Sequence, residues 1–190
     1  MSNKYHLYLN FKRHDSDNSS CLHNAFIQVC IWISEGFSIK SPFIHVEISL
    51  QKNDEFPTSY FCNHIKGVSG GDRCFTSNTY ENPMEFDITK ETYKKTKKFL
   101  DDQLGKEFNH RGYFWNFLPI IRNYSFCNVD TKGESYFCVE LVAHALIVAD
   151  ILEDTVKPYN ITAQDLYNIV KPDYISNGLN FNAMKILNNK

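Results

Sequence analysis

The sequence predicts an α+β fold in which a central antiparallel sheet packs against helices. Segments with alternating side chains, separated by polar turns, lie in the middle of the chain, a pattern that is typical of antiparallel strands. Segments with helical spacing and capping residues lie before and after them. The 190 residues contain no internal repeat and no linker, so we expect residues 1–190 to form a single domain.

The composition excludes several classes of function. Hydrophobic residues make up 43% of the chain and charged residues 22%, which is typical of a globular domain. The net charge of −2, without a basic arm, gives no basis for a nucleic-acid partner. No run approaches the roughly 18 apolar residues of a membrane span. The first residues lack the apolar region of a signal peptide. The six cysteines are therefore expected to be reduced thiols. We also expect the chain to be cytoplasmic, or to lie in the host cytoplasm or the virion if it is a viral protein.

The first elements are two strands with a helix between them. Residues 4–12, "KYHLYLNFK", alternate and predict a strand. Residues 20–34 show helical spacing after two serines and favour a helix, with a strand as the alternative. Residues 41–51, "SPFIHVEISLQ", form the clearest strand. Its more polar face carries Phe43, His45, Glu47 and Ser49.

The next elements complete the sheet and begin the helical half. Residues 58–68 are expected to form the second strand of a hairpin with the preceding strand. The following "SGGD" is expected to end this strand. Residues 73–77 are a candidate for a further short strand. Residues 87–105 form an amphipathic pattern with lysines on the outer side, and Gly105 is expected just past the helix end.

Three further helices are predicted near the C-terminal end. An aromatic segment at residues 108–121 predicts a short helix that ends near Pro119. Residues 136–152 are strongly apolar and predict a buried helix, with Ser135 as its N-cap. A short helix follows Thr162, where Asp165 gives a near capping box. The tail, residues 179–190, is expected as a last strand or a docked segment.

Cys138 lies where the longest apolar helix is expected to begin. A thiolate is the reactive form of cysteine, and both a helix N-terminus and an adjacent imidazolium favour it. The unpaired backbone N–H groups of the first turn can also hold a developing oxyanion. The alternative is that Cys138 is a small hydrophobic packing residue. A catalytic interpretation therefore requires a base from elsewhere in the chain.

His45 is the best candidate for that base among the seven histidines. It lies in the middle of an apolar strand, with Glu47 on the same face two residues later, whereas His6 sits in a polar stretch without a special setting. His64, on the expected returning strand, can lie roughly opposite His45. The alternative interpretation makes His45 a hydrogen-bonded core residue and Glu47 a solvent-facing one.

The order of three motifs resembles a known superfamily. The motifs are "FIHVEISL", "GKEFN" and "YFCVELVAHAL", within residues 40–170. They resemble the circularly permuted branch of the NlpC-type papain-like superfamily, in which the histidine strand precedes the cysteine helix. Lecithin–retinol acyltransferase belongs to that branch, together with bacterial proteins and proteins of poxviruses and other large DNA viruses. The "HVE", the pattern at residues 105–109 and the "FCxELV" helix start are most similar to the bacterial and viral group.

The resemblance implies a permuted papain-like fold with a catalytic cysteine at a helix N-terminus. It makes Cys138 the nucleophile and His45 the general base. The third polar group that orients the imidazole is Asn63 or His64 on the next strand, or else Glu47. Val139 departs from the small residue that many relatives carry after the cysteine, which narrows the site.

The resemblance implies a cysteine hydrolase with an acyl-enzyme intermediate and no cofactor or metal, acting on a peptide, amide or lipid-ester substrate. Peptidase or amidase activity is the first expectation, and lipid acyltransferase or phospholipase activity is the second. A non-catalytic viral or host-interaction module is the alternative from a different class. Zinc binding through "CLH" at residues 21–23 and "CNH" at residues 62–64 does not match the usual ligand spacings.

Overall fold

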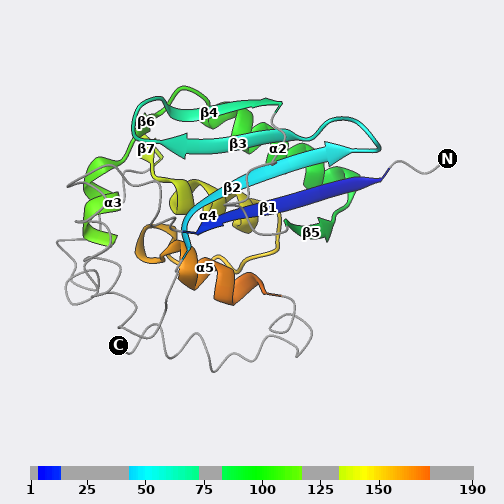
Figure 1. The fold of residues 1–190 in the computed structure, drawn as a ribbon. Helices are drawn as coiled ribbons and strands as arrows, with labels where there is room; N and C mark the ends of the chain where they lie inside the picture. Colours follow the sequence, from blue (N-terminus) through cyan, green and yellow to red (C-terminus); the bar gives the residue numbers. More distant parts are fainter. Residues whose placement is uncertain (1–3, 14–42, 73–82, 117–132, 172–190) are drawn as a thin grey trace.

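The structure is a computed structural model that describes residues 4–13, 43–72, 83–116 and 133–171. Two expected elements, the helix at 20–34 and the strand at 73–77, lie outside the described residues, as does the tail. Within the described part, the chain forms an α+β arrangement with a five-stranded antiparallel sheet and four α-helices (Figure 1). None of the described helices is long and apolar enough to cross a membrane.

The central sheet has the order β4-β3-β2-β1-β5, and every neighbouring pair in it is antiparallel. The strands are β1 (Tyr5–Arg13), β2 (Phe43–Lys52), β3 (Thr58–Asn63), β4 (Gly67–Asp72) and β5 (Met84–Asp87). The predicted antiparallel sheet is therefore confirmed, with its first two strands within two residues of the expected bounds. β2 lies at the centre of the sheet, which makes it a rigid support for its side chains.

The returning strand is confirmed in its first half, where β3 pairs antiparallel with β2, but its expected continuation is wrong, because the chain turns after Asn63 and begins β4 at Gly67. The side-chain oxygen of Asn63 accepts hydrogen bonds from the backbone N–H groups of Ile65 and Lys66, at 3.0 and 2.8 Å. Gly67 follows with φ of 65°, a conformation that favours glycine. The "SGGD" segment, expected to end the strand, belongs to β4.

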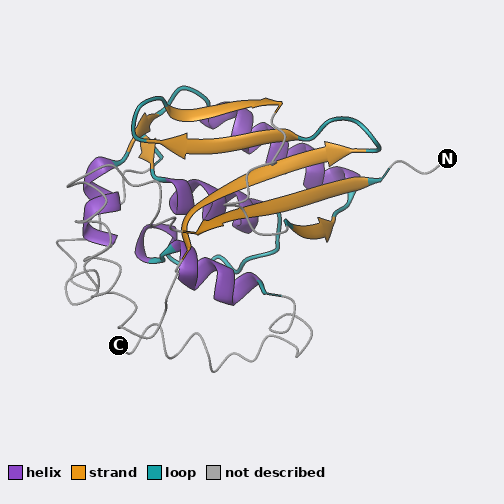
Figure 2. Ribbon diagram, in the orientation of Figure 1, coloured by secondary structure: helices purple, strands orange, loops and turns teal. Residues whose placement is uncertain are grey.

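Four α-helices follow or interleave with the later strands: α2 (Lys90–Gln103), α3 (His110–Asn116), α4 (Cys138–Val148) and α5 (Ala163–Val170). Figure 2 shows them gathered beside the sheet, and α2, α4 and α5 contact its strands. One face of the sheet, with Leu7, Leu9 and Ile48, joins the apolar side of α4 in a single buried core. This packing fixes α4 against β2 and β3.

The helix ends agree with the sequence in two cases. Thr89 caps α2 through its side chain, and Gly105 adopts φ of 82° just after the helix. Thr162 and Asp165 form the predicted capping box of α5, with both reciprocal bonds at 3.0 Å. These short-range signals were sufficient because each cap is made by residues within one helical turn.

Ser135 is not the N-cap of the apolar helix. It forms β7 (Ser135–Tyr136), which pairs in parallel with β6 (Glu107–Phe108). The backbone of this segment is therefore engaged in strand pairing, and the helix starts at Cys138 with Phe137 at the N-cap position. The physical reason for the error is that β6, the partner of β7, lies far back along the chain.

Candidate active site

Cys138 is the first residue of α4, and its side chain is buried. The first hydrogen bond of the helix runs from the N–H of Leu141 to the carbonyl of Phe137, at 3.0 Å. The backbone N–H groups at a helix start have no partner within the helix. Cys138 therefore lies at the positive end of the α4 dipole, where negative charge is favoured.

α4 meets the sheet where β2 and β3 separate. The described pairing between these strands runs only from Leu50↔Thr58 to Ile48↔Tyr60, while α4 contacts both strands. Cys138 interacts electrostatically with His45 on β2 and with Cys62 on β3, both beyond the paired stretch. The start of α4 thus lies beside the separated ends of the two strands.

His45 lies between a thiol and a carboxylate. Its Nε2 atom is 3.2 Å from Oε1 of Glu47, and the side chain of Glu47 is only 2% exposed, against 22% for that of His45. Because Nε2 is engaged by Glu47, Nδ1 is the ring nitrogen left for the Cys138 thiol, which acts electrostatically on the imidazole and raises its pKa. The structure therefore brings Cys138, His45 and Glu47 together.

The electrostatics of the site favour a charged imidazole. Burial alone lowers the pKa of His45. The negative charge and hydrogen bond of Cys138, followed by those of Glu47, act in the opposite direction and are larger in sum. The net result raises the pKa of His45 to about 9. The imidazolium is therefore the favoured form near neutral pH.

A β-bulge lies next to His45. Lys12 on β1 pairs with His45, but Arg13 pairs with Phe43, so Ile44 is the extra residue on β2. Bulges bend a strand and redirect its side chains, and they are common beside active sites. No sequence pattern indicates this bulge, because it depends on the register of β1 against β2.

A buried polar row continues from Glu47 across the same face of the sheet. Asn10 is the register partner of Glu47, and its side-chain amide donates to the Ser49 hydroxyl at 3.1 Å. The hydroxyls of Ser49 and Ser59 lie 2.9 Å apart. Asn10, Ser49 and Ser59 are all at most 1% exposed. This row links β1, β2 and β3 beside Glu47. Of its members, only Ser49 was placed on the His45 face by sequence alternation.

Glu140 and Asn109 form a second buried polar pair, and sequence reasoning missed both. A carboxylate oxygen of Glu140 lies 3.3 Å from the side-chain nitrogen of Asn109 and 3.3 Å from the backbone N–H of Phe137. The side-chain oxygen of Asn109 in turn accepts from the N–H of Gly112. The pair thereby fixes the start of α4 relative to α3. Both residues lie within motifs already singled out in the sequence, Asn109 in "GKEFN" and Glu140 in "YFCVELVAHAL". Their positions in these motifs were the available signal.

The other candidates for the orienting group lie elsewhere. His64 is in the exposed turn between β3 and β4, beyond the end of the strand on which it was expected. The side-chain oxygen of Asn63 accepts the two backbone bonds of that turn. Of the three alternatives, Glu47 is the one that contacts the imidazole. The turn after Asn63 explains the displacement of His64.

Cys62 is a second buried thiol near Cys138, with a different environment. Its Sγ donates a hydrogen bond to the backbone carbonyl of Tyr136 at 3.0 Å. Burial raises its pKa well above the usual range, and the negative charges of Cys138 and Glu140 raise it further. Cys62 is therefore held as an unreactive thiol.

A small, mostly apolar cavity adjoins Cys138. It is lined by side chains from β2, α3 and the starts of α4 and α5, among them Phe43, Ile44 and Phe137. Its volume is about 10 Å³, which is roughly the space that one water molecule requires. The nucleophile candidate thus lines a narrow space.

Among the described residues, the group with the composition and spacing of a metal site is His6, Glu85 and Asp87, which lies away from Cys138. Cys62 and His64 are not part of such a group within the described residues. The predicted pair Cys21 and His23 lies outside them.

Comparisons of the chain with models of protein families, with curated proteins and with solved structures found no match.

Proposed function

We propose that this protein is a cysteine-dependent hydrolase in which Cys138 is the nucleophile and His45 the general base. The observation that supports this most strongly is a cysteine at the first position of α4 that interacts with an imidazole whose pKa is raised to about 9. Glu47 is the positioning residue, since its buried carboxylate contacts the other side of the ring.

The resting state in this proposal is a thiolate–imidazolium pair. The N-terminus of α4 favours negative charge on Cys138, and the imidazolium beside it provides the opposite charge. Glu47 stabilises the imidazolium through its contact with Nε2 and keeps Nδ1 available for the sulfur. A similar arrangement of nucleophile, base and orienting group recurs on unrelated folds.

The reaction proceeds through an acyl-enzyme. The thiolate of Cys138 attacks the carbonyl carbon of an amide or ester, and the backbone N–H groups at the start of α4 stabilise the oxyanion. The His45 imidazolium gives its proton to the leaving amine or alcohol as the bond to the carbonyl carbon breaks. Neutral His45 then takes a proton from water, whose oxygen attacks the thioester. Release of the carboxylic acid restores the pair.

The permuted papain-like fold is part of the same proposal. Three features support it: the histidine strand β2 precedes the cysteine helix α4, the sheet is antiparallel, and the helix packs on β2. The small cavity beside Cys138 favours a peptide or amide with a compact group over a long acyl chain. Peptidase or amidase activity is therefore placed ahead of lipid acyl transfer or phospholipase activity.

Trapping of the acyl-enzyme tests the proposal. The native protein is incubated with activated esters, a peptide library and phospholipids, and adducts are located by mass spectrometry. We expect an acyl adduct on Cys138 that disappears in Cys138→Ala and is strongly reduced in His45→Ala. Cys62→Ser is the matched control, because it alters a second buried cysteine but retains a donor toward Tyr136. Turnover that persists in Cys138→Ala would contradict the proposal, because Cys138 would then not be the nucleophile. The absence of turnover and of any adduct on Cys138 in the native protein would also contradict it, and would favour the non-catalytic module.

A further inference from the structure

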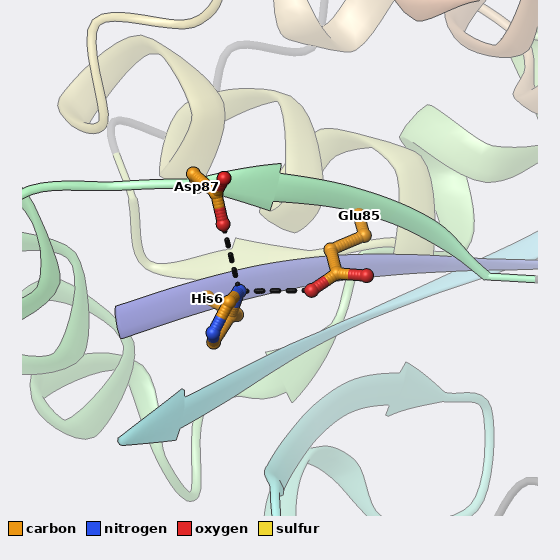
Figure 3. A group of neighbouring side chains, drawn as sticks. All are labelled: His6, Glu85 and Asp87. Carbon is orange, nitrogen blue, oxygen red and sulfur yellow. Dashed lines mark ion pairs between the residues drawn. The ribbon is translucent and has the colours of Figure 1, made fainter. Parts of the chain in front are cut away.

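A second cluster of reactive side chains lies at the opposite end of β1. His6 on β1 meets Glu85 and Asp87 on β5 (Figure 3). The register places His6 opposite Asp87 and Tyr8 opposite Glu85, so the three side chains share one face of the strand pair. His6 is six residues along β1 from Lys12, the partner of His45, which corresponds to about 20 Å. The cluster is therefore separate from the candidate active site.

The Nδ1 atom of His6 is the feature that points to a ligand. It lies 2.8 Å from Oε1 of Glu85 and 2.9 Å from Oδ1 of Asp87, approached from two directions in Figure 3. The atom is buried and within ion-pair distance of both carboxylates, yet neither contact meets hydrogen-bonding geometry among the described residues. A buried polar atom in this state requires an explanation, and an ion is one of the recognised explanations.

The surroundings supply what a metal centre needs beyond its ligands. The hydroxyl of Tyr8 lies 2.7 Å from Oε1 of Gln51 and 3.2 Å from Oε1 of Glu85, so its single proton is shared between these two acceptors beside the cluster. A pocket of about 610 Å³ lies beside the cluster and leaves room for water molecules.

We propose that His6, Glu85 and Asp87 bind a divalent transition-metal cation of the zinc type. The ligands are Nδ1 of His6 and one oxygen from each carboxylate, and water occupies the remaining position. A site that contains an imidazole suits zinc better than Mg²⁺ or Ca²⁺, which prefer oxygen ligands. Because β5 pairs with β1 alone in the described sheet, the bound ion ties this edge strand to the sheet.

Calorimetry with Zn²⁺ alone tests the proposal. The measurement uses the full chain carrying Cys138→Ala, which removes the thiol beside His45 as a competing metal ligand. We expect binding of one Zn²⁺ per chain and a rise in the unfolding temperature. The substitution His6→Ala, and the near-isosteric pair Glu85→Gln with Asp87→Asn, should each weaken binding at least tenfold. His64→Ala is the matched control, since it removes an exposed histidine elsewhere, and it should leave the affinity unchanged.

Substitution with Co²⁺ separates this site from the remaining cysteines. The proposal predicts a cobalt complex without the intense thiolate-to-metal charge-transfer absorption, because its ligands are nitrogen and oxygen. The absence of zinc binding in the Cys138→Ala background would overturn the proposal. So would equal affinity in His6→Ala, a loss of binding in His64→Ala, or a thiolate band in the cobalt spectrum.

Discussion

The imidazole of His45 and the carboxylate of Glu47 are in direct contact, with Nε2 and Oε1 3.2 Å apart. Both residues lie on the central strand β2, two positions apart, and the Glu47 carboxylate is nearly inaccessible to solvent. This contact orients the ring so that its other nitrogen is available to Cys138. It also sets the protonation behaviour from which the first two predictions follow.

The pKa of His45 should depend on Cys138. In the native protein, NMR titration of the His45 ring is expected to give a value of about 9. Cys138→Ala removes the largest favourable contribution and leaves the burial that lowers the pKa, so the value should fall well below 9. Cys62→Ser is the control and should change it little. A value that stays near 9 in Cys138→Ala would show that the thiol does not act on the ring.

Glu47→Gln should lower the pKa of His45 and change the pH dependence of stability. A group whose pKa is raised on folding contributes stability that is fully present below its unfolded value, about 6.5 for histidine. That contribution is lost as the pH rises through about 9. The difference in unfolding free energy between native protein and Glu47→Gln should therefore change between pH 6.5 and 9.5. Urea denaturation across this range measures it, and a pH-independent difference would argue against the contact with the imidazolium.

Tyr60→Phe should destabilise the fold by about 1–2 kcal/mol at pH 7, because the buried tyrosine donates to Oδ1 of Asp101 at 2.7 Å. Burial raises the pKa of Asp101, but the hydrogen bonds of Lys97 and Tyr60 outweigh it and lower the pKa overall. This contribution is present above the unfolded value and is lost as the pH falls through the lower folded one. The effect of the substitution should thus shrink near pH 3.

Lys98→Met is the matched control for that experiment. Lys98 and Asp102 form an ion pair one turn apart on the exposed side of the same helix, and such pairs contribute at most about 0.5 kcal/mol. Urea denaturation of both variants at pH 7 makes the comparison. Equal destabilisation by the two substitutions would contradict the importance assigned to the Tyr60 hydroxyl.

Gly67→Ala should destabilise the protein more than Gly105→Ala. Both glycines have positive φ, at 65° and 82°, so both substitutions incur a backbone cost of about 1–2 kcal/mol. A Cβ at position 67 would also lie 2.1 Å from the carbonyl oxygen of Lys106, whereas a Cβ at position 105 would meet nothing within 4 Å. We expect about 2–5 kcal/mol for Gly67→Ala. Thermal unfolding of both variants checks this. Similar losses of stability in the two variants would contradict the close approach of residue 67 to the Lys106 carbonyl.

Elements defined by local pattern were predictable from the sequence, and elements defined by distant pairing were not. The alternation of β1 and β2 and the capping box at Thr162 are encoded within a few residues, and the structure confirms them. Ser135 was misassigned because its strand pairs with residue 107, far back along the chain. His64 was misplaced because the turn after Asn63 depends on backbone bonds that composition does not reveal.

The same distinction applies to the sites. Cys138 and His45 each gave only a weak signal within their own segments, and the order of the motifs in the resemblance joined them into a predicted pair. Glu140 and Asn109 join only when β6 and β7 pair, since these strands bring the starts of α3 and α4 together. His6 had no special setting in the sequence. It gains one only because β1 pairs with β5, some eighty residues later.

The rate at which Cys138 is alkylated at pH 7 tests the central claim most directly. Iodoacetamide labelling, quantified residue by residue with mass spectrometry, is compared between native protein and His45→Ala, with Cys62 as the internal reference for a buried thiol. The imidazolium favours the reactive thiolate, so we predict that Cys138 reacts far faster than Cys62, and that His45→Ala slows its labelling at least tenfold. Equal rates at Cys138 in the two proteins would contradict the account.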